Sequence, residues 1–246
     1  MKMILFNFKT YVDFDSTIKL ANRIGKIRTK HRLIIAPPTL FIHALSVGLK
    51  GKSVELCAQD FDYQESYGAH TGDVLIEDLK DLGCRYVLIG HSEVRNRKDP
   101  HKGDSEELVG IKTRMCLKNG LTPVLCFGEK HEEKEAGIAK AVISRQLDTA
   151  LDGISKKKRR GIIFAYEPVW ALSSTAGARR CDVGYAEKMA LHARRVVGCG
   201  RCAVLYGGSV DKDNITSYVS SRKLDGVLIG RAGTDLKSLK HISRLL

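Results

Sequence analysis

A glutamate placed directly after a buried strand is the first candidate for a catalytic group in this sequence. Glu167 follows the apolar run at residues 161–166, which is typical of a strand covered on both faces, and precedes Pro168-Val169-Trp170. Excluding water from a carboxylate raises its pKa towards the range in which it can remove a proton. By residue type alone, a solvated glutamate before a turn is the commoner situation. The functional interpretation therefore depends on what else the fold brings to the same place.

Other residues able to carry charge or protons also follow apolar runs. Asn7 and Lys9 close the first run, and since they are two residues apart, both side chains point to the same side of an extended chain. His91 follows the fourth run, within Gly-His-Ser-Glu. Glycine-containing turns follow the last two runs, at residues 207–210 and 230–232. If the runs are parallel strands of one barrel, a base, an imidazole, an ammonium and two backbone-rich turns meet at its mouth.

These side chains can meet only if the apolar runs belong to one parallel sheet. Helical patterns, such as those at 16–24, 106–117 and 185–197, separate eight runs, at residues 3–8, 33–36, 54–58, 86–90, 122–127, 161–166, 202–206 and 226–230. Strand then helix, repeated without a Pro- or Ser-rich linker, predicts an α/β fold in which residues 1–246 form a single-domain (β/α)8 TIM barrel. An open doubly wound sheet is the alternative, but no Gly-x-Gly-x-x-Gly follows the first run.

Composition narrows the function classes. Of 246 residues, 43% are hydrophobic, so a sizeable core is available, and no apolar run approaches the roughly 18 residues that a membrane span needs. We therefore expect a soluble, cytoplasmic protein. The net charge of +13 favours anionic partners, either nucleic acid or a phosphorylated small molecule. The densest basic run, residues 156–160, has no interleaved aromatic residue and is interpreted as a solvated loop.

The cysteines favour reduced thiols. There are seven, scattered along the chain, and an odd number suits free thiols better than a disulfide framework. Cys199-Gly200-Arg201-Cys202 is a lone Cys-x-x-Cys without a second close pair, so a structural zinc site is only weakly supported. Cys202 is expected to begin a strand.

Five motifs, in order along the chain, resemble those of the triosephosphate isomerase family. They are Asn7-Phe8-Lys9, Ala36-Pro37-Pro38, Ile89-Gly90-His91-Ser92-Glu93, Ala165-Tyr166-Glu167-Pro168-Val169-Trp170-Ala171 and Tyr206-Gly207-Gly208-Ser209-Val210. Each motif alone is moderately specific, whereas five in register are highly specific. The resemblance extends from the first predicted strand to the last.

The resemblance implies interconversion of dihydroxyacetone phosphate and D-glyceraldehyde 3-phosphate through an enediolate, without metal or cofactor. It implies that Glu167 is the base and that His91, kept neutral near a helix N-terminus, polarises the carbonyl, a pairing already known for this family. Lys9 would stabilise the enediolate and Asn7 would orient the substrate. A mobile loop after Trp170 would close over the phosphate. Backbone N–H groups would hold the phosphate near Ser173, Ser209, Gly230 and Arg231.

Three further segments match the family. Residues 66–72 resemble the loop that inserts into the neighbouring subunit, which implies a homodimer with Thr71 near the second active site; an ordinary polar turn is the alternative. Glu93 is expected either to hydrogen-bond Lys9 or to have a purely structural role. Cys126 matches a buried family cysteine and is interpreted as a packing residue, not a nucleophile.

The sequence departs from the family pattern in three places. The lid reads Leu172-Ser173-Ser174-Thr175-Ala176-Gly177 where the family has Ile-Gly-Thr-Gly-Lys, so residues that adopt a positive φ only with strain replace glycines. Arg231 stands where the family has a second glycine, and its side chain must point away from the phosphate or contact it. Val94 replaces an arginine, and the basic stretch 96–103 reads as a loop insertion without an assigned function.

Two alternatives to an active isomerase remain. A barrel that keeps the phosphate site but lacks lid-gated catalysis would be a sugar-phosphate-binding protein, and the altered lid supports it. A nucleic-acid role is supported only by the net charge. The resemblance itself implies a triose phosphate and a second copy of the chain as partners, and neither nucleic acid nor a membrane.

Overall fold

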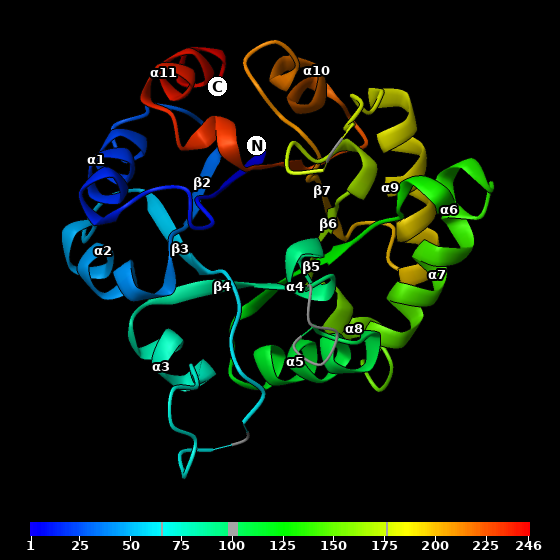
Figure 1. The fold of residues 1–246 in the computed structure, drawn as a ribbon, viewed down its shortest axis with the longest axis horizontal. Helices are drawn as coiled ribbons and strands as arrows, with labels where there is room; N and C mark the ends of the chain where they lie inside the picture. The colour runs from blue at the N-terminus through cyan, green and yellow to red at the C-terminus, as the bar shows by residue number, and fades with distance from the viewer. Residues whose placement is uncertain (65, 98–102, 176) are drawn as a thin grey trace.

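Eight parallel strands pair in chain order, and β8 pairs back with β1 to close a barrel (Figure 1). The computed structural model describes residues 1–64, 66–97, 103–175 and 177–246. The strands are β1 (Met3–Asn7), β2 (Arg32–Ala36), β3 (Val54–Ala58), β4 (Cys84–Ile89), β5 (Thr122–Phe127), β6 (Ile163–Tyr166), β7 (Ala203–Tyr206) and β8 (Gly226–Ile229). The predicted (β/α)8 barrel is therefore confirmed, and each strand lies where an apolar run predicts it.

Helices follow the strands and surround the barrel (Figure 1). The α-helices are α1 (Phe14–Ile24), α2 (Ile42–Gly48), α3 (Ile76–Asp81), α4 (Ser92–Arg95), α5 (Glu106–Lys118), α6 (His131–Glu135), α7 (Ala139–Ala150), α8 (Lys156–Arg159), α9 (Val183–Val197), α10 (Ile215–Ser220) and α11 (Leu236–Leu245). Short 3-10 turns are η1 (Thr39–Phe41), η3 (Val169–Ala171) and η4 (Arg231–Gly233). Side-chain caps start several helices; Asp13 accepts from Ser16 N at the start of α1, and Ser105 from Leu108 N at the start of α5.

Every strand buries both of its faces. One set of side chains fills the barrel interior, including Leu5, Ile34 and Leu228, which lie at one level because β1 pairs with both β2 and β8. The other set packs between the strands and the helices. This double burial is why the strand runs are continuously apolar, and polar side chains are left to the strand ends. The barrel thereby presents its chemistry at its mouth.

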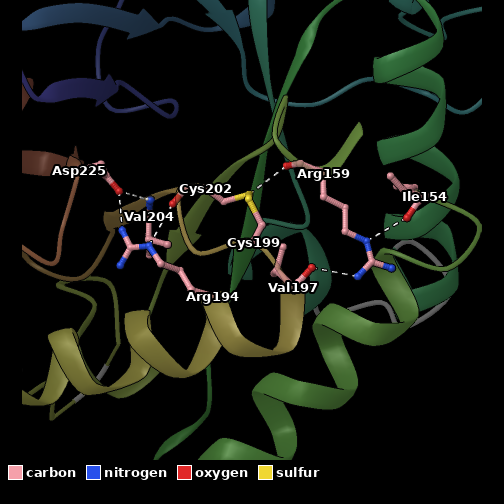
Figure 2. The surroundings of a disulfide bond; sticks show 8 residues. All are labelled: Ile154, Arg159, Arg194, Val197, Cys199, Cys202, Val204 and Asp225. Carbon is pink, nitrogen blue, oxygen red and sulfur yellow. Dashed lines mark hydrogen bonds and ion pairs between the residues drawn. A yellow bond between two sulfur atoms is a disulfide. The ribbon is translucent and has the colours of Figure 1, made fainter. Parts of the chain in front are cut away.

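The expectation of reduced thiols is wrong for one pair. Cys199 and Cys202 form a disulfide in the turn between α9 and β7, whereas Cys57, Cys84, Cys116, Cys126 and Cys181 are free and buried (Figure 2). The helix ends at Gly198, which adopts the left-handed conformation, and the strand begins at Ala203. This tight reversal brings the two cysteine Cα atoms to 5.4 Å, within disulfide range. The bond also occupies both sulfurs that the weakly supported zinc site would require.

Two basic segments were predicted to be loops. One of them is helical, and the other lies partly outside the described residues. Lys156–Arg159 form the short helix α8 and not a loop, although their lysines are exposed as expected. Of the stretch 96–103, residues 98–102 lie outside the described residues, so the proposed insertion stays a prediction. Within the parts of the chain that the structure describes, no helix is long and apolar enough to cross a membrane.

Candidate active site

The predicted site residues gather at the mouth of the barrel. Asn7 is the last residue of β1, His91 lies two residues beyond β4, and Glu167 follows β6 directly. A cavity of about 370 Å³ opens there. Its lining includes Lys9, His91, Ser173, Ser174, Gly207, Ser209, Gly230, Arg231 and Asp235. Neither Glu167 nor Asn7 is part of this lining, but each contacts a residue that is, Glu167 through His91 and Asn7 through Lys9.

Glu167 is fully buried and faces the imidazole. Its Oε1 lies 3.4 Å from His91 Nε2 but has no hydrogen-bond partner among the described residues. Its Oε2 accepts a hydrogen bond from the backbone N–H of Ser92 at 3.2 Å. A buried carboxylate with one unpaired oxygen is poised to accept a proton.

The two ring nitrogens of His91 have different partners. Its Nδ1 accepts a hydrogen bond from the backbone N–H of Glu93 at 3.2 Å, so this nitrogen carries no proton. The side chain is buried, and His91 is the N-cap residue of the short helix α4. The other ring nitrogen, Nε2, is the one that lies beside Glu167. The role of His91 as a neutral electrophile stays a prediction.

Lys9 is held by both its backbone and its ammonium group. It is the one non-glycine residue of the described chain with a positive φ, 47°. The side chain of Asn7 accepts from Lys9 N at 3.0 Å, and Gln59 Nε2 donates to Lys9 O at 3.0 Å. Lys9 Nζ lies 2.5 Å from Glu93 Oε1, so the expected Lys9–Glu93 hydrogen bond is present. Such a strained conformation persists where the surroundings fix it, and active sites are typical places for it.

The Lys9 contact also affects the acidity of Glu93. Partial burial raises the pKa of this carboxyl, but the hydrogen bond and positive charge of Lys9 outweigh burial, and the pKa is lowered overall. Glu93 therefore stays ionised beside the ammonium group. The contact fixes the ammonium group of Lys9, a residue that lines the cavity.

A buried carboxylate beneath the lid was missed by reasoning from the sequence. Glu129, just after β5, is fully buried and accepts from Trp170 Nε1 at 2.8 Å, from Tyr166 OH at 2.9 Å and from Tyr185 OH at 3.2 Å. Burial and, secondarily, the Glu129 charge raise the pKa of Tyr166 well above its ordinary value, so this phenol remains a donor. The signal was available: Glu129 is a charged residue at a strand end, like Glu167.

Two glycines leave room for Glu167. A Cβ atom on Gly207 would lie 2.8 Å from Glu167 Cγ, and a Cβ atom on Gly128 would lie 2.1 Å from Glu167 O. Both separations are below normal van der Waals contact, so the strand ends can approach the glutamate only because these residues lack side chains. The glycine turn after β7 therefore determines where the carboxylate sits.

The predicted phosphate donors lie along one side of the cavity. Ser209 N donates to Ala171 O at 3.0 Å and Ser209 Oγ donates to the same oxygen at 2.7 Å, so the lid base occupies this N–H in the present conformation. Gly230 and Arg231 also line the cavity. The Arg231 guanidinium lies 5.2 Å from the centre of the Tyr11 ring, a cation–π distance.

The lid does not show the backbone strain that its missing glycines suggested. Within the described part of residues 172–177, only Gly177 has a positive φ, 69°, and Ser173 and Ser174 are exposed at the cavity edge. Thr175 Oγ1 donates to Val169 O at 2.7 Å, which ties the lid to η3. Gly177 therefore takes the left-handed position among the described lid residues.

Cys126 fits its predicted packing role. Its side chain is buried inside the barrel, and burial raises the pKa of its thiol well above the ordinary value. A thiol of this kind stays protonated and is a poor nucleophile.

Comparison with known proteins agrees with this geometry. A family model described as triosephosphate isomerase matches residues 2–246. The chain is 40% identical over 217 residues to a triosephosphate isomerase of Symbiobacterium thermophilum, covering 85% of this chain and 82% of that protein. It is 34% identical over 251 residues to one from Dictyoglomus thermophilum, covering 98% of each. It is 36% identical over 247 residues to one from Pseudomonas putida, covering 98% of this chain and 97% of that protein.

Proposed function

The chain belongs to the triosephosphate isomerase family, and from this premise we propose that it interconverts dihydroxyacetone phosphate and D-glyceraldehyde 3-phosphate through an enediolate. The observation that carries the proposal is the pairing of Glu167 Oε1 with His91 Nε2, 3.4 Å apart, beside a cavity that Lys9 also lines. A protein that only binds a sugar phosphate has no need of a base in this position.

Glu167 is the base in this mechanism. Its unpaired oxygen rotates towards the substrate and removes the proton from the carbon next to the carbonyl. The Nε2–H of neutral His91 donates to the carbonyl oxygen and then moves a proton between the two oxygens of the enediolate. Fixed donors in a water-poor cavity stabilise the developing negative charge.

Lys9 and Asn7 prepare the same site. The Lys9 ammonium places a positive charge beside the enediolate oxygens, and Glu93 keeps that charge in position. Asn7 holds the Lys9 backbone through its side-chain oxygen, and its amide group orients the substrate. These two residues act on both ground and transition states, so their loss affects binding as well as turnover.

The phosphate is bound by backbone N–H groups of Ser173, Ser209, Gly230 and Arg231. Because Ala171 O occupies Ser209 N, substrate binding requires the lid base to move, and this movement couples phosphate binding to lid closure. A closed lid prevents loss of phosphate from the enediolate and uncontrolled reprotonation.

The test is isomerisation of glyceraldehyde 3-phosphate by the purified protein, with inorganic phosphate release followed in parallel. Glu167→Gln should abolish most turnover while phosphate-analogue affinity stays within about threefold, because the substitution changes the base and leaves the phosphate amides intact. A comparable loss of turnover and analogue binding would contradict the assignment of Glu167 as base.

A catalytically impaired sugar-phosphate-binding barrel is the second candidate. The altered lid, Ser173-Ser174-Thr175, is the observation that favours it. The same assay distinguishes the two: tight analogue binding without turnover, or turnover dominated by phosphate release, supports the impaired protein.

We further propose a cytoplasmic homodimer in which residues 66–72 insert beside the neighbouring active site, with Thr71 at the contact. Large apolar side chains are exposed repeatedly after β1, β2 and β3: Tyr11, Phe14, Leu40, Val47, Tyr63 and Tyr67. A run of exposed apolar side chains at one region favours a protein interface. Sedimentation should give a dimer for the parent and a monomer of low turnover for Thr71→Arg; a parent monomer with full activity would contradict the proposal.

A further inference from the structure

The disulfide between Cys199 and Cys202 lies at the opposite end of β7 from the active site. The turn that carries it precedes Ala203, the first residue of β7, whereas the cavity residues follow Tyr206, the last residue. Chemistry at this turn is therefore independent of the proposed isomerase function.

The two cysteines are both buried and differ slightly in exposure. Cys199 as a whole residue is 7% exposed and Cys202 is 2% exposed. Cys199 is flanked by Gly198 and Gly200, both exposed, and a Cβ atom on Gly200 would have no neighbour within 4 Å. Cys199 is itself buried, but both of its chain neighbours are exposed glycines without side chains, so it is the cysteine of the pair that lies nearer to solvent.

The sulfur of Cys202 lies beside a backbone carbonyl oxygen that could accept a hydrogen bond from its thiol. Cys202 Sγ lies 3.4 Å from Arg159 O (Figure 2). A disulfide sulfur carries no hydrogen, so this contact becomes an S–H···O hydrogen bond only after the bond to Cys199 breaks. The turn is also held by its backbone, since Cys199 N donates to Arg194 O at 3.1 Å and Cys202 N to Cys199 O at 3.2 Å. The oxidised turn therefore already places an acceptor beside the sulfur that would carry a hydrogen after reduction.

Positive charge surrounds the bond. Figure 2 shows the guanidinium groups of Arg159 and Arg194 on either side of it, and Asp225, the carboxylate in that view, is paired with Arg194 at 2.6 Å. Lys156 of α8 lies beside Gly198, with its Cε 3.4 Å from where a Cβ would stand, and Arg201 is exposed on the turn. Such a field attracts an anionic thiol and stabilises the thiolate that leaves.

We propose that the Cys199–Cys202 disulfide is a site of thiol–disulfide exchange with small anionic thiols, such as cysteine-containing peptides with free carboxylates. The incoming thiolate bonds to Cys199 Sγ as the Cys199–Cys202 bond breaks, and the electron pair leaves on Cys202 Sγ. This thiolate takes a proton from water, and the resulting S–H donates a hydrogen bond to Arg159 O. A second thiolate attacks the mixed disulfide, releasing the small-molecule disulfide and leaving the Cys199 thiol. The protein gains two electrons and two protons, which two small thiols lose.

The exchange is confined to this pair. The five free cysteines are buried, and burial raises the pKa of each of their thiols, so they are protonated and poorly reactive. Cys199 follows the C-terminus of α9, where the helix field does not stabilise a thiolate. An external thiol therefore attacks the disulfide of this turn, whereas Cys199 is not activated as the attacking thiolate of an oxidoreductase would be.

The experiment compares 3-mercaptopropionate, which is anionic, with 2-mercaptoethanol, which is neutral, as reductants of the folded, oxidised protein at one pH. Rates are normalised to thiolate concentration, and intact and peptide mass spectra follow the mixed disulfide. The anionic thiol should react severalfold faster at low salt, with the mixed disulfide on Cys199, and the advantage should shrink as salt rises. Equal normalised rates at low salt, attachment to Cys202, or reduction only in denaturant would overturn the proposal.

Charge variants test the electrostatic part. Lys156→Ser/Lys157→Ser should reduce the advantage of the anionic thiol, whereas the matched pair Lys237→Ser/Lys240→Ser, on exposed positions of α11, should leave it unchanged. The same reduction in both pairs would mean that net charge, and not this turn, sets the preference. Cys199→Ser/Cys202→Ser should eliminate exchange while isomerase activity stays within twofold of the parent; persisting exchange would place the reaction at another cysteine.

Discussion

The indole N–H of Trp170 donates a hydrogen bond to Glu129 Oε1 at 2.8 Å, and Glu129 is fully buried. Trp170 lies in η3, at the base of the lid, and Glu129 lies just after β5. The bond therefore connects the lid to a fixed point of the barrel. Because Tyr166 and Tyr185 donate to the same carboxylate, one buried charge organises three donors around the lid base.

Replacing Glu129 with glutamine should destabilise the protein and disturb the lid. The glutamine amide keeps the shape but loses acceptor capacity, so buried donors lose partners, at a cost of about 2 kcal/mol in the free energy of unfolding. Urea unfolding and kcat check this. Trp170→Phe removes a single donor, and its effect should be smaller in the Glu129→Gln background than in the parent. Additive effects would show that the two residues are not coupled.

Gly207→Ala should slow turnover because its Cβ would lie 2.8 Å from Glu167 Cγ and displace the base. A displacement approaching 1 Å lowers kcat by roughly a hundredfold, while the affinity for a phosphate analogue should change little. Steady-state kinetics and calorimetry measure the two effects. Gly48→Ala, where a Cβ meets nothing within 4 Å, is the matched control and should retain parental kcat. An unchanged kcat in Gly207→Ala would mean that the glutamate position is not critical.

The lid prediction concerns the segment Ser173-Ser174-Thr175. Replacement by Gly-Thr-Gly gives the backbone access to positive φ at the tip and removes the Thr175 Oγ1 hydrogen bond to Val169 O. If closure limits the rate, kcat should change and phosphate release per turnover should fall. Both are measured in the isomerisation assay. Identical turnover and identical product partition would show that the present lid already closes efficiently.

Arg231→Gly tests whether the guanidinium contributes to phosphate binding. The side chain lines the cavity and lies over Tyr11, so its charge is close to the predicted phosphate donors. Loss of an interaction made equally in ground and transition states should raise KM severalfold and leave kcat unchanged. Arg231→Lys should recover part of the affinity. A parental KM in the glycine variant would show that the arginine points away from the substrate.

We expect the Lys9–Glu93 ion pair to make a pH-dependent contribution to the free energy of unfolding. Lys9 lowers the pKa of Glu93, so the pair stabilises the fold above the unfolded pKa of a glutamate, about 4.3, and this contribution is lost as pH falls through the folded value. The effect should be modest because Glu93 is 44% exposed. Urea unfolding of the parent and Glu93→Gln should differ at pH 7 and converge towards pH 3. A constant difference across this range would contradict the linkage.

Much of the fold and site could be predicted from local patterns. The apolar runs identified all eight strands because a strand buried on both faces carries apolar side chains at most of its positions. The ends of those runs then identified Asn7, Lys9, His91 and Glu167, since parallel strands in one barrel place their carboxyl ends together.

Only the tertiary structure decided which side chains meet across distant segments. Glu129 and Trp170 are 41 residues apart, so no local pattern pairs them. The disulfide between Cys199 and Cys202 forms because the turn between α9 and β7 is short and brings the two cysteines together. The hydrogen bond from Ser209 N to Ala171 O depends on the conformation of the lid. The sequence by itself determined the barrel and its candidate chemistry through burial and periodicity, whereas hydrogen-bond partners and the oxidation of one cysteine pair followed from distances that exist only after folding.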